Sequence, residues 1–388
     1  MKFQKSFFSI IFLLSCAVLF SQIKDPSSIY RKERDKINNL VHTKLKVDFN
    51  FEKKELNGEE WLTLEPHFYP TNRVVLDAKA MIIQTVSLDD KNLDYTYDGY
   101  QLTIELPKEY KKGEHYTLYL KYIARPEKVK DKGSIAITAA KGLYFINSTG
   151  SDPNKPTQIW TQGETEANSC WFPTIDSPNQ KTSQEIYITV PKKFKTLSNG
   201  ILVSQENSGS NRTDYWKFDQ KHAPYLIFMG VGEYEVIEDS YKNIPVNYYV
   251  EKKYASVAKD IFGLTPEMIG FFEDRLGVAY PWAKYSQIVA REYVSGAMEN
   301  TTAVVHGDDA YQLKGQLIDE NRQENTIAHE IFHHWFGNLV TSESWSNLAL
   351  NESFANYSQY LWREYKYGKT DADAHLFENI KAYKDDTD

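Results

Sequence analysis

Apolar and polar residues alternate along several stretches between about residues 43 and 238. In the first stretch, Leu45, Val47, Phe49 and Phe51 alternate with lysine, aspartate and asparagine. Because successive side chains of a strand point to opposite faces, this period of two predicts strands with one buried and one wetted face. The same pattern recurs at residues 116–122 and 186–190. Many short strands in succession predict an antiparallel β domain of a saddle-like or sandwich-like kind.

Two dipeptides in this segment have the composition of tight turns. Asn57-Gly58 precedes the apolar residues at 61–64, and Asp98-Gly99 separates alternating stretches at 93–97 and 102–106. Asparagine, aspartate and glycine tolerate the left-handed backbone that two-residue hairpins require. We therefore predict a hairpin turn at each dipeptide, and a loop at the polar residues 207–211.

The pattern changes to helical spacing after about residue 243. Thr265 and Pro266 predict the start of a helix with Thr265 as N-cap, and Gly277 predicts its end. Further helices are expected near residues 319–338, 348–365 and 371–384, and strands at 287–290 and 302–305. The helix at 348–365 is expected to bury a stripe formed by Phe354, Tyr357, Leu361 and Tyr365. These elements predict an α+β unit at residues 241–388, preceded by an all-β domain at 22–240.

Residues 1–21 predict a secretory signal peptide. Two lysines precede an apolar run at 7–20, which is too short to span a bilayer comfortably, and the sequence then becomes polar. We expect cleavage near Ser21, a secreted or periplasmic protein, and no membrane span afterwards. The alternatives are a short membrane anchor and a lipoprotein attached through Cys16. The second is disfavoured because the apolar run continues past Cys16.

Composition excludes several classes of protein. Hydrophobic residues make up 41% of the 388 residues and aromatic residues 14%, which is enough to bury cores and excludes global disorder. The formal net charge of −8 argues against a nucleic-acid-binding protein, which would normally carry a basic face. Cys16 and Cys170 are the two cysteines, so cleavage of the signal would leave no internal disulfide. We expect Cys170 to be a buried structural residue.

The sequence His329-Glu330-Ile331-Phe332-His333 lies in the second predicted helix. Histidines four residues apart share one helical face, so both imidazoles can reach one metal at about 2.0–2.1 Å. The carboxylate of Glu330 then remains free to act on a water molecule. This five-residue pattern alone is only moderately specific, because two histidines on a solvated helix surface would produce it too.

A third candidate ligand strengthens the interpretation. Glu352 lies 19 residues after His333 on the next predicted helix. Two histidines and one glutamate form the ligand set of a catalytic zinc site, with the fourth position left for water, whereas structural zinc usually takes four protein ligands. We predict one Zn²⁺ per chain, bound by His329, His333 and Glu352. His334 points about 100° away around the helix and is not expected to be a ligand.

With these residues, the chain resembles the M1 family of zinc aminopeptidases, which are gluzincins. The matching motifs are Gly296-Ala297-Met298-Glu299-Asn300, His329 to His333 with 335–341 after it, Leu350-Asn351-Glu352, and Thr161-Gln162-Gly163-Glu164 followed by Trp171-Phe172-Pro173. They stand in the order of the family and cover essentially everything after the signal. The resemblance implies a β domain followed by the first part of a thermolysin-like α+β catalytic domain, which releases the N-terminal residue of peptides.

The resemblance also implies a role for each matched residue. His329, His333 and Glu352 would bind zinc, and Glu330 would be the catalytic base. Glu299 and Glu164 would bind the free α-ammonium group of the peptide substrate, while Gly296 and Ala297 would present their backbones to it. Gln162 would shape the first side-chain pocket. Without the zinc motif, Glu164 and Glu299 would be interpreted as solvated loop carboxylates.

The chain departs from the family in three respects. Ser353 replaces the usual glycine and Ala349 an aromatic residue, and only 36 residues follow Glu352, whereas the family places an oxyanion-stabilising tyrosine farther along. Five tyrosines in this region lie in no matching context: Tyr357, Tyr360, Tyr365, Tyr367 and Tyr383. We therefore expect a truncated chain or a fragment of a longer protein.

Two alternative functions follow from these departures and from the zinc motif itself. One is a zinc-binding but inactive scaffold, since loss of one oxyanion donor costs about 10²–10³ in rate. The other is a thermolysin-like endopeptidase, which the motif at 296–300 disfavours. The pattern makes no prediction of the oligomeric state.

Overall fold

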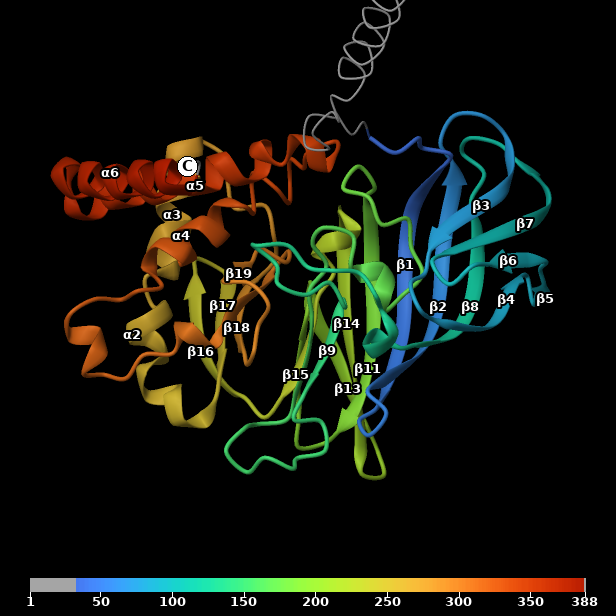
Figure 1. Cartoon of the computed structure of the whole chain (residues 1–388), viewed down its shortest axis with the longest axis horizontal. Coiled ribbons are helices and arrows are strands. Elements are labelled where there is room, and N and C mark those ends of the chain that lie inside the picture. The colour runs from blue at the N-terminus through green and yellow to red at the C-terminus, as the bar shows by residue number, and fades with distance from the viewer. Residues whose placement is uncertain (1–32, 387–388) are drawn as a thin grey trace, which may run out of the picture.

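A computed structural model describes residues 33–386 of the chain (Figure 1). The predicted signal peptide and Cys16 lie outside these residues, so export stays a prediction. Strands occupy the right and centre of Figure 1, and helices gather at the left. Within the described residues, no helix combines the length and hydropathy that a bilayer crossing requires.

The first part of the chain is built on an eight-stranded sheet in the order β13-β14-β11-β1-β2-β8-β4-β5. Its strands are β1 (Asn38–Asn50), β2 (Glu55–Pro66), β4 (Ile82–Leu88), β5 (Lys91–Asn92), β8 (Tyr116–Ala124), β11 (Thr182–Pro191), β13 (Ile201–Ser208) and β14 (Asn211–His222). Leu45, Leu118 and Ile186 are buried, as the alternation predicts. β1 and β11 pair in parallel, whereas the other described pairs of this sheet are antiparallel. The predicted β-rich fold of the first part is confirmed.

Two smaller sheets complete this part. One contains β3 (Thr71–Asp77), β7 (Gln101–Tyr110) and β6 (Tyr95–Tyr97), and the other contains β12 (Lys195–Ser198), β15 (Met229–Gly232), β10 (Gln158–Thr161) and β9 (Leu143–Ile146). Their apolar faces join that of the large sheet in one hydrophobic cluster, which includes Leu62, Trp160 and Phe228. The same cluster continues into the second part of the chain through Ile288, Met298 and Val305. Cys170 is buried, as predicted.

One of the two predicted hairpin turns is present. Asp98-Gly99 lies between β6 and β7, and Gly99 has a φ of 96°, in the left-handed region that favours glycine. The Asp98 carboxylate accepts hydrogen bonds from the backbone N–H groups of Tyr100 and Gln101 at 2.8 and 2.7 Å. The loop at 207–211 is likewise a tight connection between β13 and β14.

The turn predicted at Asn57-Gly58 is wrong. Both residues lie inside β2, and the connection from β1 falls at residues 51–54 instead. Gly58 is paired with Tyr122 of the neighbouring strand, and a Cβ at position 58 would lie 2.2 Å from the tyrosine ring. This glycine therefore allows a close approach of two strands, a role that local composition does not distinguish from a turn.

The second part contains a five-stranded sheet in the order β16-β17-β18-β20-β19, with α-helices beside it (Figure 1). The strands are β16 (Glu235–Tyr241), β17 (Ile244–Val250), β18 (Tyr285–Ala290), β19 (Ala297–Met298) and β20 (Ala303–Gly307). The helices are α2 (Ala258–Phe262), α3 (Thr265–Leu276), α4 (Glu324–Phe332), α5 (Ala349–Tyr367) and α6 (Lys369–Asp386). Short 3₁₀ turns lie at Pro126–Lys128, Asn168–Cys170, Pro224–Leu226, Lys252–Val257, Asp308–Ala310, Gln316–Ile318 and Trp345–Asn347. The predicted α+β character is confirmed, although β16 begins before the expected division at 241.

Helix boundaries differ from the sequence prediction in two places. Thr265 is not the N-cap of α3 but lies in its first turn, where its hydroxyl donates to the carbonyl of Phe262 at 2.6 Å. Gly277 ends α3 with a φ of 65°, as predicted. Helix α4 is shorter than the expected 319–338 at both ends. Before it, the side-chain amide of Asn321 donates to the carbonyl of Ile261, and after Phe332 the N–H groups of His334 and Trp335 bond three residues back in a tighter turn.

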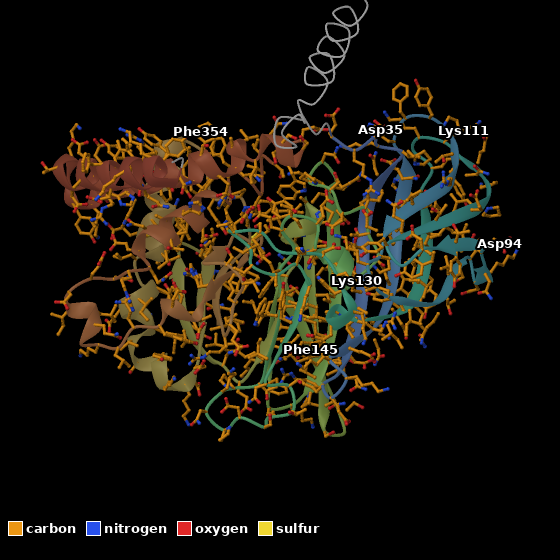
Figure 2. The ribbon with its side chains drawn as sticks, in the orientation of Figure 1. Asp35, Asp94, Lys111, Lys130, Phe145 and Phe354 are labelled. Carbon is orange, nitrogen blue, oxygen red and sulfur yellow. The ribbon has the colours of Figure 1, made fainter. Side chains whose placement is uncertain are left out.

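The stripe predicted to be buried on α5 is wrong. Phe354, Tyr357 and Tyr365 are 45%, 53% and 57% exposed, and Phe354 stands at the edge of the molecule in Figure 2. The buried face of α5 instead carries Asn351, Ala355, Ser358 and Trp362. Small and polar residues fit here because they face α4: Ser358 donates to Ala328, and the Trp362 indole donates to Glu324 at 2.7 Å.

Glu60 on β2 is a buried acid without a partner. Its side chain is fully buried, neither carboxyl oxygen has a hydrogen-bond partner among the described residues, and burial raises its pKa well above the ordinary value. We expect Glu60→Leu to raise the free energy of unfolding at pH 7 by about 1–3 kcal/mol, since an unpaired buried polar group is removed. Calorimetric melting of both proteins measures this difference.

The pH dependence of that gain follows from the raised pKa. Above the unfolded carboxyl pKa of about 4.3, the folded wild type must bind a proton at Glu60 that the unfolded chain lacks, so wild-type stability falls as pH rises. The advantage of Glu60→Leu should therefore be small below pH 4 and should grow towards pH 8. Glu59→Leu, on the opposite face of β2, is the matched control. An advantage that does not change with pH would contradict the raised pKa of Glu60.

Candidate metal centre

Three predicted ligands come together at one point. The Nε2 atoms of His329 on α4 and of His333, the residue that follows this helix, are 2.9 Å apart, and Glu352 on α5 places carboxylate oxygens 3.4 Å and 3.7 Å from them. These donor atoms all lie within 4.8 Å of one another. Two nitrogen donors and one carboxylate at this spacing can share a single divalent metal ion.

His333 is held by the turn that follows α4. Its Nδ1–H donates to the carbonyl of Phe336 at 3.0 Å, which leaves the lone pair of Nε2 directed at the cluster. Gly337 has a φ of 130°, and a Cβ there would come within 3.0 Å of the His333 ring. The close approach of this turn therefore fixes the orientation of the imidazole.

His329 has an outer partner that sequence reasoning missed. Its Nδ1 lies 3.4 Å from Nε2 of Gln359, and Oε1 of Gln359 lies 3.2 Å from Nε2 of His375. For Nε2 of His329 to bind a metal, Nδ1 must carry the proton and Gln359 must present its oxygen, which a rotation of the amide provides. The sequence held one signal that could have identified Gln359: it lies seven residues after Glu352, which puts both side chains on one face of α5.

The protonation states of the three residues suit a metal. Burial lowers the pKa of His329 and of His333, so both imidazoles are neutral at pH 7. For Glu352, burial opposes ionisation, but the two histidines outweigh it and lower its pKa. Neutral imidazole and ionised carboxylate are the forms that coordinate zinc, so the residues present fit the ion.

Glu330 lies beside the cluster as a buried acid. Its side chain is 5% exposed, and Oε2 has no hydrogen-bond partner among the described residues. Burial raises its pKa well above the ordinary value, and the charges of Glu299, Glu352 and Glu164 add to the effect. A desolvated carboxyl with a free oxygen is suited to accept and return a proton.

Glu299 and Glu164 form an acidic pair near the metal cluster. Burial, together with the charge of Glu352, raises the pKa of Glu299 to about 7, and burial with the charge of Glu299 raises that of Glu164 well above its ordinary value. Glu299 is buried and Glu164 is half-buried. Carboxyls that repel one another's charge favour a bound cation, and an α-ammonium group is one of suitable size.

Tyr225 joins two of the motifs, and sequence reasoning missed it. Its hydroxyl donates to Oε1 of Glu299 at 3.2 Å and accepts from the side-chain amide of Asn351 at 3.3 Å. Asn338 donates to the main-chain carbonyl of Glu299 at 2.8 Å. Nothing in the sequence around Tyr225 points to the cleft, because its partners lie more than 70 residues farther along the chain.

A cleft of about 460 Å³ contains these groups, a volume within the usual range for ligand sites. Its walls come from both parts of the chain: Ser134, Ala136, Ile137, Glu164, Thr165, residues 295–299, Thr326, His329, Glu330, His333, Leu348, Glu352, Asn356 and Gln359. Gly296 and Ala297 therefore line the cleft. Gln162 does not: it is buried behind Met298, 3.3 Å from its sulfur, and accepts a hydrogen bond from the hydroxyl of Tyr293.

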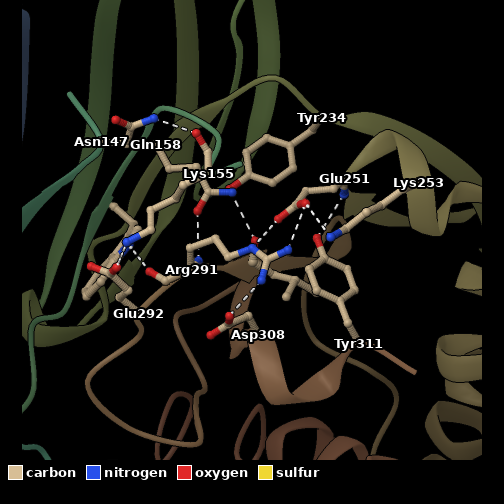
Figure 3. A network of polar contacts seen from close by, with 12 residues as sticks. Asn147, Lys155, Gln158, Tyr234, Glu251, Lys253, Arg291, Glu292, Asp308 and Tyr311 are labelled. Carbon is tan, nitrogen blue, oxygen red and sulfur yellow. Dashed lines mark hydrogen bonds and ion pairs between the residues drawn. The ribbon is translucent and has the colours of Figure 1, made fainter. Parts of the chain in front are cut away.

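An ion-pair network anchors the segment that leads into residues 296–299 (Figure 3). Arg291, just after β18, makes a two-point contact with Glu251 at 2.5 and 2.9 Å and a third contact with Asp308 at 3.0 Å. Its backbone N–H donates to Gln158 of β10 at 2.8 Å. Bidentate arginine–carboxylate pairs fix geometry well, so the cleft segment is tied to the sheets of both parts.

Comparisons with known proteins give the same family for both parts. The Peptidase M1 N-terminal domain matches residues 39–226, and the Peptidase family M1 domain matches residues 261–387. Probable aminopeptidase 1 of Saccharolobus solfataricus is 28% identical over 350 residues, which are 87% of this chain and 42% of that protein. Glutamyl aminopeptidase of Bos taurus is 33% identical over 199 residues, 49% of this chain and 20% of that protein. The chain thus spans less than half the length of these curated relatives.

A solved structure has a similar fold. The crystal structure of an M1 zinc metallopeptidase from Deinococcus radiodurans, bound to a Tyr-Ser-Ala substrate, matches 92% of this chain and 77% of that chain. The TM-score is 0.74 and the sequence identity 19%. At this identity, the likeness shows a common fold across both parts of the chain.

Proposed function

Because this chain belongs to peptidase family M1, we propose that it is a zinc-dependent aminopeptidase that releases the N-terminal residue of peptides. The observation that carries the proposal is the convergence of His329, His333 and Glu352 in the cleft that also contains Glu164 and Glu299. The first three residues suit a metal ion, and the last two suit the ammonium group of a peptide.

His329, His333 and Glu352 would hold the zinc ion. When bound, zinc supplies a Lewis acid that polarises the scissile carbonyl and makes water more acidic. Glu330 would take a proton from the water as its oxygen bonds to the carbonyl carbon. As the carbon–nitrogen bond breaks, Glu330 would pass that proton to the leaving amine.

Glu164 and Glu299 would bind the α-ammonium group and so fix which bond is cut. An internal peptide bond brings no cation into the cleft and would leave these carboxylates without a partner, at a cost of several kcal/mol in rough terms. Gly296 and Ala297 would lie against the substrate main chain, where a small side chain permits close approach. Cleavage would therefore start from a free N-terminus.

A second candidate is the zinc-binding but inactive scaffold. It is favoured by one observation: no tyrosine is among the described residues that line the cleft. A missing oxyanion donor costs about 10²–10³ in rate, so binding could persist while turnover becomes very slow.

One assay with two matched substrates tests the proposal. We expect the zinc-loaded protein to cleave leucine p-nitroanilide, to lose this activity with 1,10-phenanthroline, and to regain it with added Zn²⁺. N-acetyl-leucine p-nitroanilide should not be cleaved detectably, because it lacks the cation that Glu164 and Glu299 bind. Stoichiometric zinc without cleavage of either substrate would favour the scaffold. Cleavage of the acetylated substrate at a similar rate would favour an endopeptidase.

A further inference from the structure

One segment of the β domain between β8 and β9 reaches the cleft. Residues 132–139 form a closed turn in which Lys132 and Ala139 are bridged. Within it, the backbone N–H of Ser134 donates to the carbonyl of Ile137 at 2.6 Å, and the N–H of Ile137 donates to the Ser134 hydroxyl at 3.0 Å. A Cβ at Gly133 would lie 2.3 Å from the carbonyl carbon of Thr138, so the turn closes tightly there. We call residues 132–139 the cleft turn.

The cleft turn is fastened to the segment that carries Glu299. The backbone N–H and the hydroxyl of Thr138 both donate to the carbonyl of Val294, at 2.9 and 3.2 Å. Val294 lies two residues before Gly296. At the base of the turn, the hydroxyl of Tyr144 donates to the carbonyl of Ala139 at 2.7 Å. These contacts keep Ile137 at a fixed position relative to Glu299.

Three residues of the cleft turn line the cleft, and two of them, Ala136 and Ile137, are apolar while the third is Ser134. Ala136 is exposed, and Ile137 is half-buried and packs on the core. Both line the cleft together with Met298, Ala297 and Leu348. The titratable groups among the lining residues are carboxyls and histidines, with no lysine or arginine. An apolar wall beside carboxylates suits a ligand that has an ammonium group and an aliphatic side chain on the same carbon.

We propose that the cleft turn determines which N-terminal residue is accepted, with Ile137 as the selecting side chain and an aliphatic residue such as leucine as the preferred one. The inference rests on the proposed function, since it takes the ammonium group to be bound by Glu164 and Glu299. The side chain of the first residue leaves the carbon that carries this ammonium group. It therefore lies close to Glu299, in the cleft that Met298 and Ile137 also line and where Thr138, the neighbour of Ile137, is bonded to Val294.

The inference can be tested separately from the proposed function by measuring peptide binding to a variant that lacks the catalytic base. Glu330→Gln serves as the parent, and calorimetric titration measures the dissociation constants of Leu-Ala-Ala, Ala-Ala-Ala and Lys-Ala-Ala. Adding Ile137→Ala should weaken Leu-Ala-Ala about tenfold and leave Ala-Ala-Ala nearly unchanged, because one aliphatic contact is lost. Adding Ile137→Asp should raise the affinity for Lys-Ala-Ala relative to that for Leu-Ala-Ala by about tenfold or more, because a carboxylate then faces the side chain of the first residue.

Ile82→Ala provides the matched control. Ile82 lies on β4, which is at the right of Figure 1, is not among the residues that line the cleft, and is 41% exposed. It should leave all three dissociation constants unchanged. If the parent binds the peptides and both Ile137 substitutions leave their ratios unchanged, the inference is overturned while the proposed function stands. If the zinc-loaded parent binds none of the peptides, the proposed function fails and the inference with it.

Discussion

Replacing Glu330 by glutamine is expected to lower kcat by about 10²–10⁴-fold while the zinc content of the protein stays the same. Glutamine has nearly the shape of glutamate but cannot accept a proton, and Oε2 of Glu330 makes no hydrogen bond that the amide would break. None of the three ligands is touched. Steady-state kinetics on leucine p-nitroanilide and metal analysis of the same preparation measure the two quantities.

Glu324→Gln is the control on the same helix. Its carboxylate is also buried, but it accepts hydrogen bonds from the Trp362 indole and the Tyr367 hydroxyl and lies outside the cleft lining. This variant should keep kcat near the wild-type value. If Glu330→Gln turned over substrate as fast as Glu324→Gln, Glu330 would not be the base.

The second large effect is expected for the metal ligands. The His333→Ala protein should lose its zinc during dialysis, because only two of the three protein ligands remain. The imidazole of His333 is also the most deeply buried of the three ligands. Gln359→Leu should weaken zinc about 10–100-fold, since it removes the outer partner of His329 rather than a ligand. Equilibrium dialysis against a competing chelator ranks the two variants.

Thermal melting gives an independent measure of the same loss. A ligand present at 100 times its dissociation constant stabilises the folded protein by about 2.7 kcal/mol. Zinc should therefore raise the melting temperature of the wild type and of His115→Ala, an exposed histidine in the β domain, but not that of His333→Ala. An equal rise in all three proteins would mean that the ion binds elsewhere.

The sequence allowed prediction of the features that depend on local spacing. Histidines four residues apart on a helix share a face in any fold, so the pairing of His329 with His333 followed from the pattern alone. The alternation at Leu45 and Val47 likewise predicted their burial. Gly99 was recognised because a tight turn needs a left-handed residue.

Features that depend on partners remote in sequence could not be predicted. Gly58 permits close packing against Tyr122, and this tyrosine is identified only by the strand register. On α5, the aromatic stripe suggested the wrong buried face, because the real one carries Ala355 and Ser358 to fit α4. Tyr225 and Gln359 were missed for the same reason, since each acts on a group from another element.

The hydrophobic cluster that runs from Leu62 in the β domain to Val305 in the second sheet has a consequence for cooperativity. The second part has a further hydrophobic cluster of its own, which includes Val246, Phe272 and Ile327, but separating the two parts near residue 240 would still expose Ile288 and Met298 on one fragment and their contacts on the other. The chain should melt in a single transition, and an ion bound between α4 and α5 would then protect strands at the far end of the molecule against proteolysis. Binding of a metal ion at this one site would in this way increase the resistance of both parts of the chain to unfolding and proteolysis.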